Sequence, residues 1–212
     1  MTRTDLLAAA HALARHDLVT AFGHVSCREG DTMLITGPVD LATAGESDLV
    51  RVGLHCVRLP EGAPPEAWAH LAIYRARFDV EAVVRAMPPS GFAAASVTEA
   101  VLPVHGQAAW VGSVPVHDSA LLLRSVELAT AAAATLGSGD AVLLRGNGAL
   151  TVGDSPGVAV ARMWLLEVAC RTWLKASSSG TPRPLSVEET RAWRHAGAGL
   201  LPRLWRHLAG QE

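Results

Sequence analysis

The chain has 212 residues, half of them hydrophobic, and a formal net charge of −2. This length can bury one substantial core, and no Pro/Gly/Ser-rich stretch is long enough to separate two domains. The arginines are scattered among acidic residues, which argues against nucleic-acid binding. No apolar run approaches the roughly 20 residues that span a bilayer, and the N-terminus lacks a secretory pattern, so we expect a cytoplasmic protein without membrane contact.

The cysteines and the single lysine argue against disulfides, thiolate metal sites and Schiff-base chemistry. The three cysteines, Cys27, Cys56 and Cys170, are widely spaced and odd in number, which suggests neither a disulfide framework nor a thiolate metal site. The single lysine, Lys175, is expected at the polar end of a helix. Because a Schiff-base aldolase needs a desolvated lysine with a lowered pKa, lysine-imine chemistry is not expected.

The N-terminal part predicts one helix followed by strands. Thr2 and Asp5 have capping-box spacing and begin the helix. Apolar residues on both sides of a turn at Gly30 indicate a hairpin, and alternation further along indicates a third strand. The expected strands cover residues 25–27, 33–35 and 52–59.

The rest of the chain alternates helices and short strands. Pro64 and Pro65 precede a helix with Glu66 in its first turn, which favours helix initiation. The later expected elements are a strand at 82–84, a helix from Pro88-Pro89, two strands around Gly112 and Pro115, a helix at 120–136, a hairpin joining 141–145 to 149–152 across Gly146-Asn147-Gly148, a helix from Ser155-Pro156 to about residue 175, and a tail helix capped at Ser186.

Several short motifs occur in a characteristic order. They are Gly23-His24-Val25-Ser26, Leu34-Ile35-Thr36, Glu66 with the downstream His70-Leu71-Ala72-Ile73-Tyr74, Ala82-Val83-Val84, and Leu143-Leu144-Arg145. Together they resemble the class II aldolase/adducin family along roughly residues 4 to 176. The resemblance implies an α/β fold with three α/β/α layers, a mixed, mainly antiparallel sheet, and a homotetramer with active sites between subunits. We accordingly expect a domain at 1–176 and a C-terminal helical tail at 177–212, packed on the same domain or on a neighbouring subunit.

In typical members of that family, two histidines after the Ala-Val-Val strand and a third in the following hairpin hold a divalent metal. The corresponding positions here are Arg85, Met87 and Asn147. Arginine cannot lose its proton to become a ligand, methionine sulfur suits soft ions, and a lone asparagine is a weak zinc ligand. The usual metal site is therefore not expected to form, and no cofactor is predicted.

Glu66 and Arg85 are the predicted catalytic residues. Glu66 matches the family's catalytic glutamate, and it is either a general base or a first-turn residue favoured by the helix dipole. Arg85 either holds a carboxylate or stabilises an enolate in place of the metal, or it pairs with an acid such as Glu66 in a degenerate site. A rearranged metal site of Glu66, His70 and His105 is a third alternative.

Other positions point to the substrate. Pro64 and Pro65 stand where sugar-phosphate aldolases have phosphate-binding serines, so a phosphorylated substrate is disfavoured. The Gly-His-Val-Ser motif is similar to the branch with decarboxylases of aromatic and hydroxy acids, in which a C-terminal tail covers the site. Asn147 also suits a tight hairpin without any catalytic role. The predicted substrate-binding residues are His24, Ser26, Thr36, Met87, His105, Asn147 and Trp205.

Two functional hypotheses follow. The first is a metal-independent lyase-like enzyme that acts by decarboxylation, aldol-type cleavage or a related enolate-forming reaction on a small, carboxylate-bearing, non-phosphorylated substrate. The second is a non-catalytic, adducin-like oligomeric binding or scaffold protein, which the loss of all three histidines would also explain.

Overall fold

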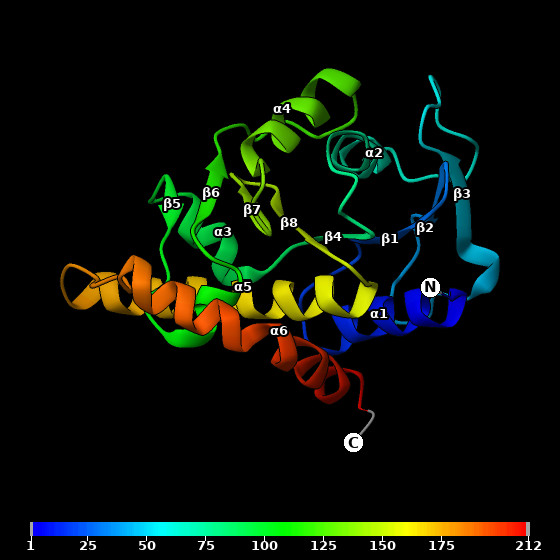
Figure 1. The fold of residues 1–212 in the computed structure, drawn as a ribbon. Helices are drawn as coiled ribbons and strands as arrows, with labels where there is room; N and C mark the ends of the chain where they lie inside the picture. The colour runs from blue at the N-terminus through cyan, green and yellow to red at the C-terminus, as the bar shows by residue number, and fades with distance from the viewer. Residues whose placement is uncertain (1, 211–212) are drawn as a thin grey trace.

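The structure, a computed structural model, describes residues 2–210, apart from the side chain of residue 198. Within that range an eight-stranded sheet has the order β3-β2-β1-β4-β8-β7-β6-β5 (Figure 1). All neighbouring strands pair antiparallel except β6 and β7, which are parallel. The strands are β1 (His24–Glu29), β2 (Thr32–Thr36), β3 (Leu49–Gly53), β4 (Ala82–Ala86), β5 (Ala100–Val101), β6 (Val114–His117), β7 (Ala141–Leu144) and β8 (Gly148–Gly153).

Helices cover both faces of this sheet, as expected for three α/β/α layers (Figure 1). Helices α2 and α4 lie on one face, α1, α3 and α5 lie on the other, and α6 packs on the outside of α5. The helices are α1 (Arg3–Arg15), α2 (Ala67–Ala76), α3 (Pro89–Ala95), α4 (Val126–Leu136), α5 (Pro156–Ser179) and α6 (Val187–Ala209), with 3-10 turns η1 (Glu46–Asp48) and η2 (Gly106–Trp110). No helix within residues 2–210 is both long and apolar enough to cross a membrane.

Strand β4 shows how the sheet serves two cores. Its side chains alternate between the faces, so Ala82 and Val84 join the core under α1 and α5 while Val83 joins the core under α2 and α4. A strand covered on both faces reads as a continuous apolar run. Arg85 interrupts that run and, by the same alternation, projects to the face that α2 and α4 cover.

The predicted hairpins across residues 29–31 and 146–148 and the capping boxes at Thr2 and Ser186 are confirmed. The third strand was wrongly predicted at 52–59, since it lies at Leu49–Gly53. The reason is pairing: β2 begins at Thr32, opposite Gly53, so residues beyond Gly53 have no partner strand.

The helix predicted at 120–136 begins only at Val126. Ser125 is its N-cap and accepts a hydrogen bond from the backbone N–H of Leu128, which satisfies a free donor at the helix start. Residues 120–125 are therefore a loop. Likewise, the segment before Gly112 is the turn η2 and not a strand, and α5 continues through the serines that were expected to end it.

The tail helix α6 packs on its own chain. Arg194 forms an ion pair of 2.6 Å with Asp140, and the indole N–H of Trp110 donates to the carbonyl oxygen of Trp193 at 2.8 Å. Leu201 and Leu208 complete the apolar contact, since both are buried in the core that α1 and α5 share. One face of α6 is thus part of the subunit's own core.

Candidate functional site

Three polar side chains from distant parts of the chain form a closed triangle. The Nη2 group of Arg85 lies 3.1 Å from Oε2 of Glu66 and donates to Oδ1 of Asn147 at 2.5 Å. The amide Nδ2 of Asn147 donates to Oε1 of Glu66 at 3.4 Å, and the backbone N–H of Leu123 donates to the same oxygen at 3.3 Å. Glu66 is 7% exposed, Arg85 2% and Asn147 5%, so the cluster is almost fully withdrawn from water.

Local sequence explains how each member is positioned. Glu66 is the N-cap residue of α2, directly after Pro64 and Pro65. In the β7–β8 turn, Gly146 and Gly148 adopt positive φ angles of 68° and 87°, whereas Asn147 does not. The glycines therefore supply the left-handed backbone of this turn. Asn147 is not required for that conformation, and its side chain instead contacts Arg85 and Glu66.

The triangle lines a cavity of about 390 Å³. Four buried polar or charged side chains converge on the cavity, and most of the other lining side chains are apolar. Such a combination, apolar walls with a few convergent polar groups, is typical of small-molecule sites. Five of the predicted site residues meet here. The lining consists of Phe22, His24, Pro38, Pro65, Glu66, Arg85, Met87, Leu122, Arg124 and Asn147.

Ser26 and Thr36 are fully buried and do not line this cavity. The hydroxyl of Ser26 bonds to Nδ1 of His70 at 2.7 Å and to the hydroxyl of Tyr74 at 2.8 Å. Thr36 accepts a hydrogen bond from a backbone N–H of β1 at 3.1 Å. Within this chain, Ser26 therefore links β1 to helix α2 through His70 and Tyr74, and Thr36 links β2 to β1.

His105 and Trp205 also lie away from the cavity of their own chain. His105 is the N-cap residue of η2, where its Nδ1 accepts from the N–H of Ala108 at 3.3 Å. Trp205 lies against Gly157, and a Cβ atom at that glycine would come within 2.6 Å of the indole ring. The expectation that Trp205 covers the site is therefore not met within one subunit, because the helix that carries it packs on the opposite side of the sheet.

Two buried histidines lie beside the triangle. His24 faces Arg85 across the β1–β4 ladder, and its ring centroid is 6.0 Å from that of His70. Burial, reinforced by the charge of Arg85, lowers the pKa of His24 to about 3. Burial also lowers the pKa of His70 well below its ordinary value, with smaller contributions from His24 and Arg85. Both imidazoles are consequently neutral at physiological pH.

The lowered pKa values of His24 and His70 predict that the stability of the fold decreases in acid. In the unfolded chain they bind protons near pH 6.5, while folded His24 binds one only near pH 3. The free energy of unfolding is therefore fully retained above pH 6.5 and falls as pH decreases toward 3, by at most about 1.4 kcal/mol per pH unit for each histidine. Urea denaturation as a function of pH should give a shallower dependence for His24→Gln than for the wild type. The matched variant of exposed His195, His195→Gln, should keep the full slope.

The donor set at the triangle does not suit a divalent cation. The Arg85 guanidinium is a buried cation already paired with Glu66, and the Asn147 oxygen is engaged by Arg85. Among residues 2–210, no three or more His, Cys, Asp or Glu side chains are grouped as metal ligands. Glu66, His70 and His105 are thus not gathered into the rearranged metal site that the sequence left open.

Phe22, Leu122 and Arg124 line the cavity but were not among the predicted site residues. Phe22 is 67% exposed and Leu122 47% exposed, so both lie where the cavity opens to solvent. The only signal in the sequence was the apolar run at 121–123, which ends in an arginine. That run was wrongly assigned to a helix, where its exposure to the cavity could not be inferred.

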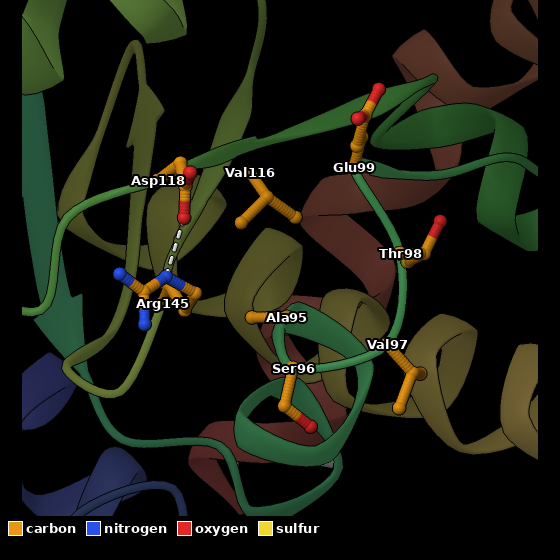
Figure 2. A pocket seen from close by; sticks show the side chains of 8 residues that line it. All are labelled: Ala95, Ser96, Val97, Thr98, Glu99, Val116, Asp118 and Arg145. Atoms are coloured by element: carbon orange, nitrogen blue, oxygen red, sulfur yellow. Dashed lines mark hydrogen bonds and ion pairs between the residues drawn. The ribbon is translucent and has the colours of Figure 1, made fainter.

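A second, larger cavity of about 460 Å³ is lined by the end of α3 and the segment after it, by β6 and by Arg145, which follows β7 (Figure 2). Its polar side chains are exposed or only partly buried, and Arg145 forms a 2.5 Å ion pair with Asp118. The cavity contains none of the predicted site residues, so we place the candidate site at the smaller, more deeply buried one. The larger cavity is lined by Ala95, Ser96, Val97, Thr98, Glu99, Val116, Asp118 and Arg145.

Comparisons with known proteins agree with this fold. A model of the class II aldolase and adducin N-terminal domain matches residues 4–174. A 3,4-dihydroxyphthalate decarboxylase from Arthrobacter keyseri is 30% identical over 197 residues, which cover 84% of this chain and 79% of that protein. Alpha-adducin from Rattus norvegicus is 33% identical over 115 residues, or 53% of this chain and 16% of the adducin. A solved L-fuculose 1-phosphate aldolase has a TM-score of 0.84 at 24% identity, covering 93% of this chain and 98% of its own.

Proposed function

Because the chain belongs to the class II aldolase and adducin family, we propose that it is a metal-independent, cytoplasmic, lyase-like enzyme for a small, carboxylate-bearing substrate without phosphate. The observation that carries the proposal is the buried triangle of Glu66, Arg85 and Asn147 in the cavity wall. The resemblance to the family puts Arg85 at the expected position of a metal-binding histidine, so in this proposal a fixed guanidinium replaces the metal cation. Decarboxylation is the favoured reaction, since a decarboxylase is 30% identical over most of this chain.

Arg85 retains the donors that such a reaction requires. Its Nη2 group bonds to Glu66 and Asn147, but its Nε and Nη1 groups are buried and have no hydrogen-bond partner within the described chain. Buried donors of this kind stabilise negative charge without reorganisation. We infer that they stabilise the oxygen on which charge develops in the transition state.

In the proposed decarboxylation, the carbon–carbon bond to the departing carboxylate breaks and CO₂ leaves. The bonding electron pair passes onto an oxygen conjugated with the remaining carbon. Arg85 stabilises that enolate-like oxygen, and Glu66 then delivers to the carbon a proton that originates from water. In an aldol-type cleavage, Glu66 first takes the proton of the hydroxyl group and the same oxygen receives the electron pair.

The lining also supports a substrate without phosphate. Pro65 contributes an apolar wall where a hydroxyl donor would be needed, and Pro38 adds a second one. Proline has neither a side-chain hydroxyl nor a backbone N–H to offer an anion. Arg124 is the only cation of the lining outside the triangle.

The test is turnover by purified protein on a panel of aromatic and hydroxy acids that includes 3,4-dihydroxyphthalate, followed as CO₂ release and product formation. We expect Glu66→Gln to lower kcat by about 10²–10⁴-fold because proton transfer is lost. The matched variant Glu61→Gln, at an exposed position five residues away, should keep wild-type kcat. Equal turnover by Glu66→Gln and the wild type would contradict the proposed mechanism.

A metal measurement checks the independence from metal. Protein purified without an affinity tag should contain well under one divalent ion per subunit by elemental mass spectrometry. Incubation with a chelator should change neither its melting temperature nor its turnover. About one tightly bound ion per subunit, with loss of activity on chelation, would refute metal independence.

The similarity to alpha-adducin favours a second candidate, a non-catalytic binding or scaffold role. It covers 53% of this chain and 16% of the adducin. The two candidates differ in one observation, because a scaffold would bind small acids without converting them. For either function we propose a homotetramer, which light scattering would detect as a mass four times that of the 22.2 kDa chain.

A further inference from the structure

The charges around the candidate cavity do not cancel. Glu66 and Arg85 are 3.1 Å apart and neutralise each other. His24 is uncharged at neutral pH, since its pKa is lowered to about 3. The remaining charged residue of the lining is Arg124. The cavity therefore carries one uncompensated positive charge, and this charge belongs to Arg124.

Arg124 differs from Arg85 in its environment. The Arg85 guanidinium is buried and bonded on one side to Glu66 and Asn147. The Arg124 side chain is exposed, and within residues 2–210 its guanidinium has no hydrogen bond or ion pair. All five of its N–H donors are thus available to a ligand, in the planar arrangement that matches a carboxylate.

The backbone of Arg124 is nevertheless held in place. The preceding residue, Leu123, is 2% exposed, and its N–H donates to Glu66 at 3.3 Å. The following residue, Ser125, caps α4 through a hydrogen bond to the N–H of Leu128. Arg124 is therefore anchored on both sides at the opening of the cavity, one residue from a direct contact with the triangle.

Apolar side chains surround this cation. Phe22 and Leu122 are exposed members of the same lining, and Pro65 lies beside Glu66 in the sequence. A ligand with an apolar body and one anionic end would cover these side chains and neutralise the free charge. A neutral ligand would leave Arg124 without a partner.

We propose that Arg124 binds the carboxylate that the substrate retains, and that it determines the cavity's specificity for acids. This inference rests on the proposed function, because it places the retained carboxylate at the opening and the reacting carbon near Glu66 and Arg85. The role of Arg85 is then confined to the charge that develops during the reaction, and Arg124 supplies ground-state binding.

Binding measurements test the inference with three probes, benzoate, 4-hydroxybenzoate and phenylacetate, and with benzamide as a neutral analogue of benzoate. Isothermal titration calorimetry of the wild-type protein should show the acids binding at least tenfold more tightly than benzamide. Arg124→Gln should weaken the acids by about tenfold or more and leave benzamide unchanged, since a charged hydrogen-bond partner is lost. Arg145→Gln is the matched control, because Arg145 is a partly exposed arginine outside the cavity whose loss should leave all four affinities unchanged (Figure 2).

The possible outcomes separate the two claims. Equal affinity of the acids for wild-type and Arg124→Gln protein would overturn the role of Arg124 and leave the proposed function standing, with another group as the anchor. Failure of all three acids to bind the wild-type protein, with turnover still observed on the wider acid panel, would overturn the role of Arg124 alone, whereas failure of both binding and turnover would overturn both claims. Where turnover is measurable, Arg124→Gln should raise KM with little change in kcat, whereas Glu66→Gln lowers kcat.

Discussion

Replacing Arg85 with methionine is expected to destabilise the fold by about 3–5 kcal/mol, because it leaves a buried carboxylate without its cation. The side chains of Arg85 and Glu66 are only 3% and 10% exposed, so water cannot take over the role of the guanidinium. Methionine keeps the apolar stem of the arginine and removes only the charged end. Urea denaturation at neutral pH measures the difference in the free energy of unfolding.

A second substitution should restore much of that loss. In the double variant Arg85→Met/Glu66→Gln no charge is buried, and the amide that replaces the Glu66 carboxylate keeps an oxygen to accept the hydrogen bonds of Leu123 and Asn147. The double variant should therefore be more stable than Arg85→Met alone, by at least half of the original loss. Arg85→Met with wild-type stability, or a double variant as unstable as Arg85→Met, would show that the two charges are not energetically coupled.

Arg145→Met provides a control with the same change of residue. Arg145 is also ion-paired, at 2.5 Å to Asp118, but its side chain is 47% exposed and that of Asp118 84% exposed. Exposed pairs contribute about 0–1 kcal/mol, so this variant should lie within that range of the wild type. Both variants remove an arginine from a short ion pair with a carboxylate. The difference between their losses of stability therefore measures the effect of burying the pair.

The resemblance to the family singled out Arg85, Met87 and Asn147 as the positions of its metal-binding histidines, and in the structure all three line one cavity. Their places at the end of a buried strand and inside a Gly-Asn-Gly turn are local patterns that survive tertiary packing. Strand alternation then dictates that His24, Ser26 and Arg85 share one face of the sheet. Because α2 lies over that face, Glu66 contacts Arg85 and His70 lies beside His24.

The opening of the cavity could not be predicted in the same way. Arg124 precedes a helix whose start is set by the Ser125 cap, and the sequence pattern had continued that helix back to residue 120. Inside a helix Arg124 would be one more exposed arginine, whereas in the loop it lines the cavity and follows Leu123, whose N–H donates to Glu66. Element boundaries are the least reliable part of any pattern-based prediction, and here a boundary decides whether Arg124 lies in a helix or in a loop that lines the cavity.

His105 and Trp205 show a different limit. Both were predicted to line the site, but within one subunit His105 caps η2 and Trp205 packs on Gly157. No local pattern encodes which surface of a helix meets its own domain and which meets a neighbouring chain. A role for either residue across a subunit boundary stays a prediction that the proposed tetramer would have to support.

Gly148 does not line the cavity, but we expect Gly148→Ala to disturb the site through the backbone. Gly148 has φ of 87°, and a Cβ atom there would lie 2.2 Å from the carbonyl oxygen of Ala86, which is backbone and cannot rotate away. The left-handed conformation alone costs about 1–2 kcal/mol, and the clash forces β8 away from β4, so we expect a total of about 3 kcal/mol or more. The shift would also displace Asn147, the preceding residue, from Arg85.

Gly30→Ala separates the two contributions. Gly30 has φ of 60° in the β1–β2 hairpin, and a Cβ atom there would meet nothing within 4 Å. Its substitution should therefore cost only the backbone term, about 1–2 kcal/mol. In thermal and urea denaturation the difference between the two variants then reports the close approach of the β7–β8 turn to β4. Equal losses for Gly148→Ala and Gly30→Ala would mean that this turn can move away from β4 at little cost, and that Asn147 is held less rigidly than its hydrogen bonds to Arg85 and Glu66 require.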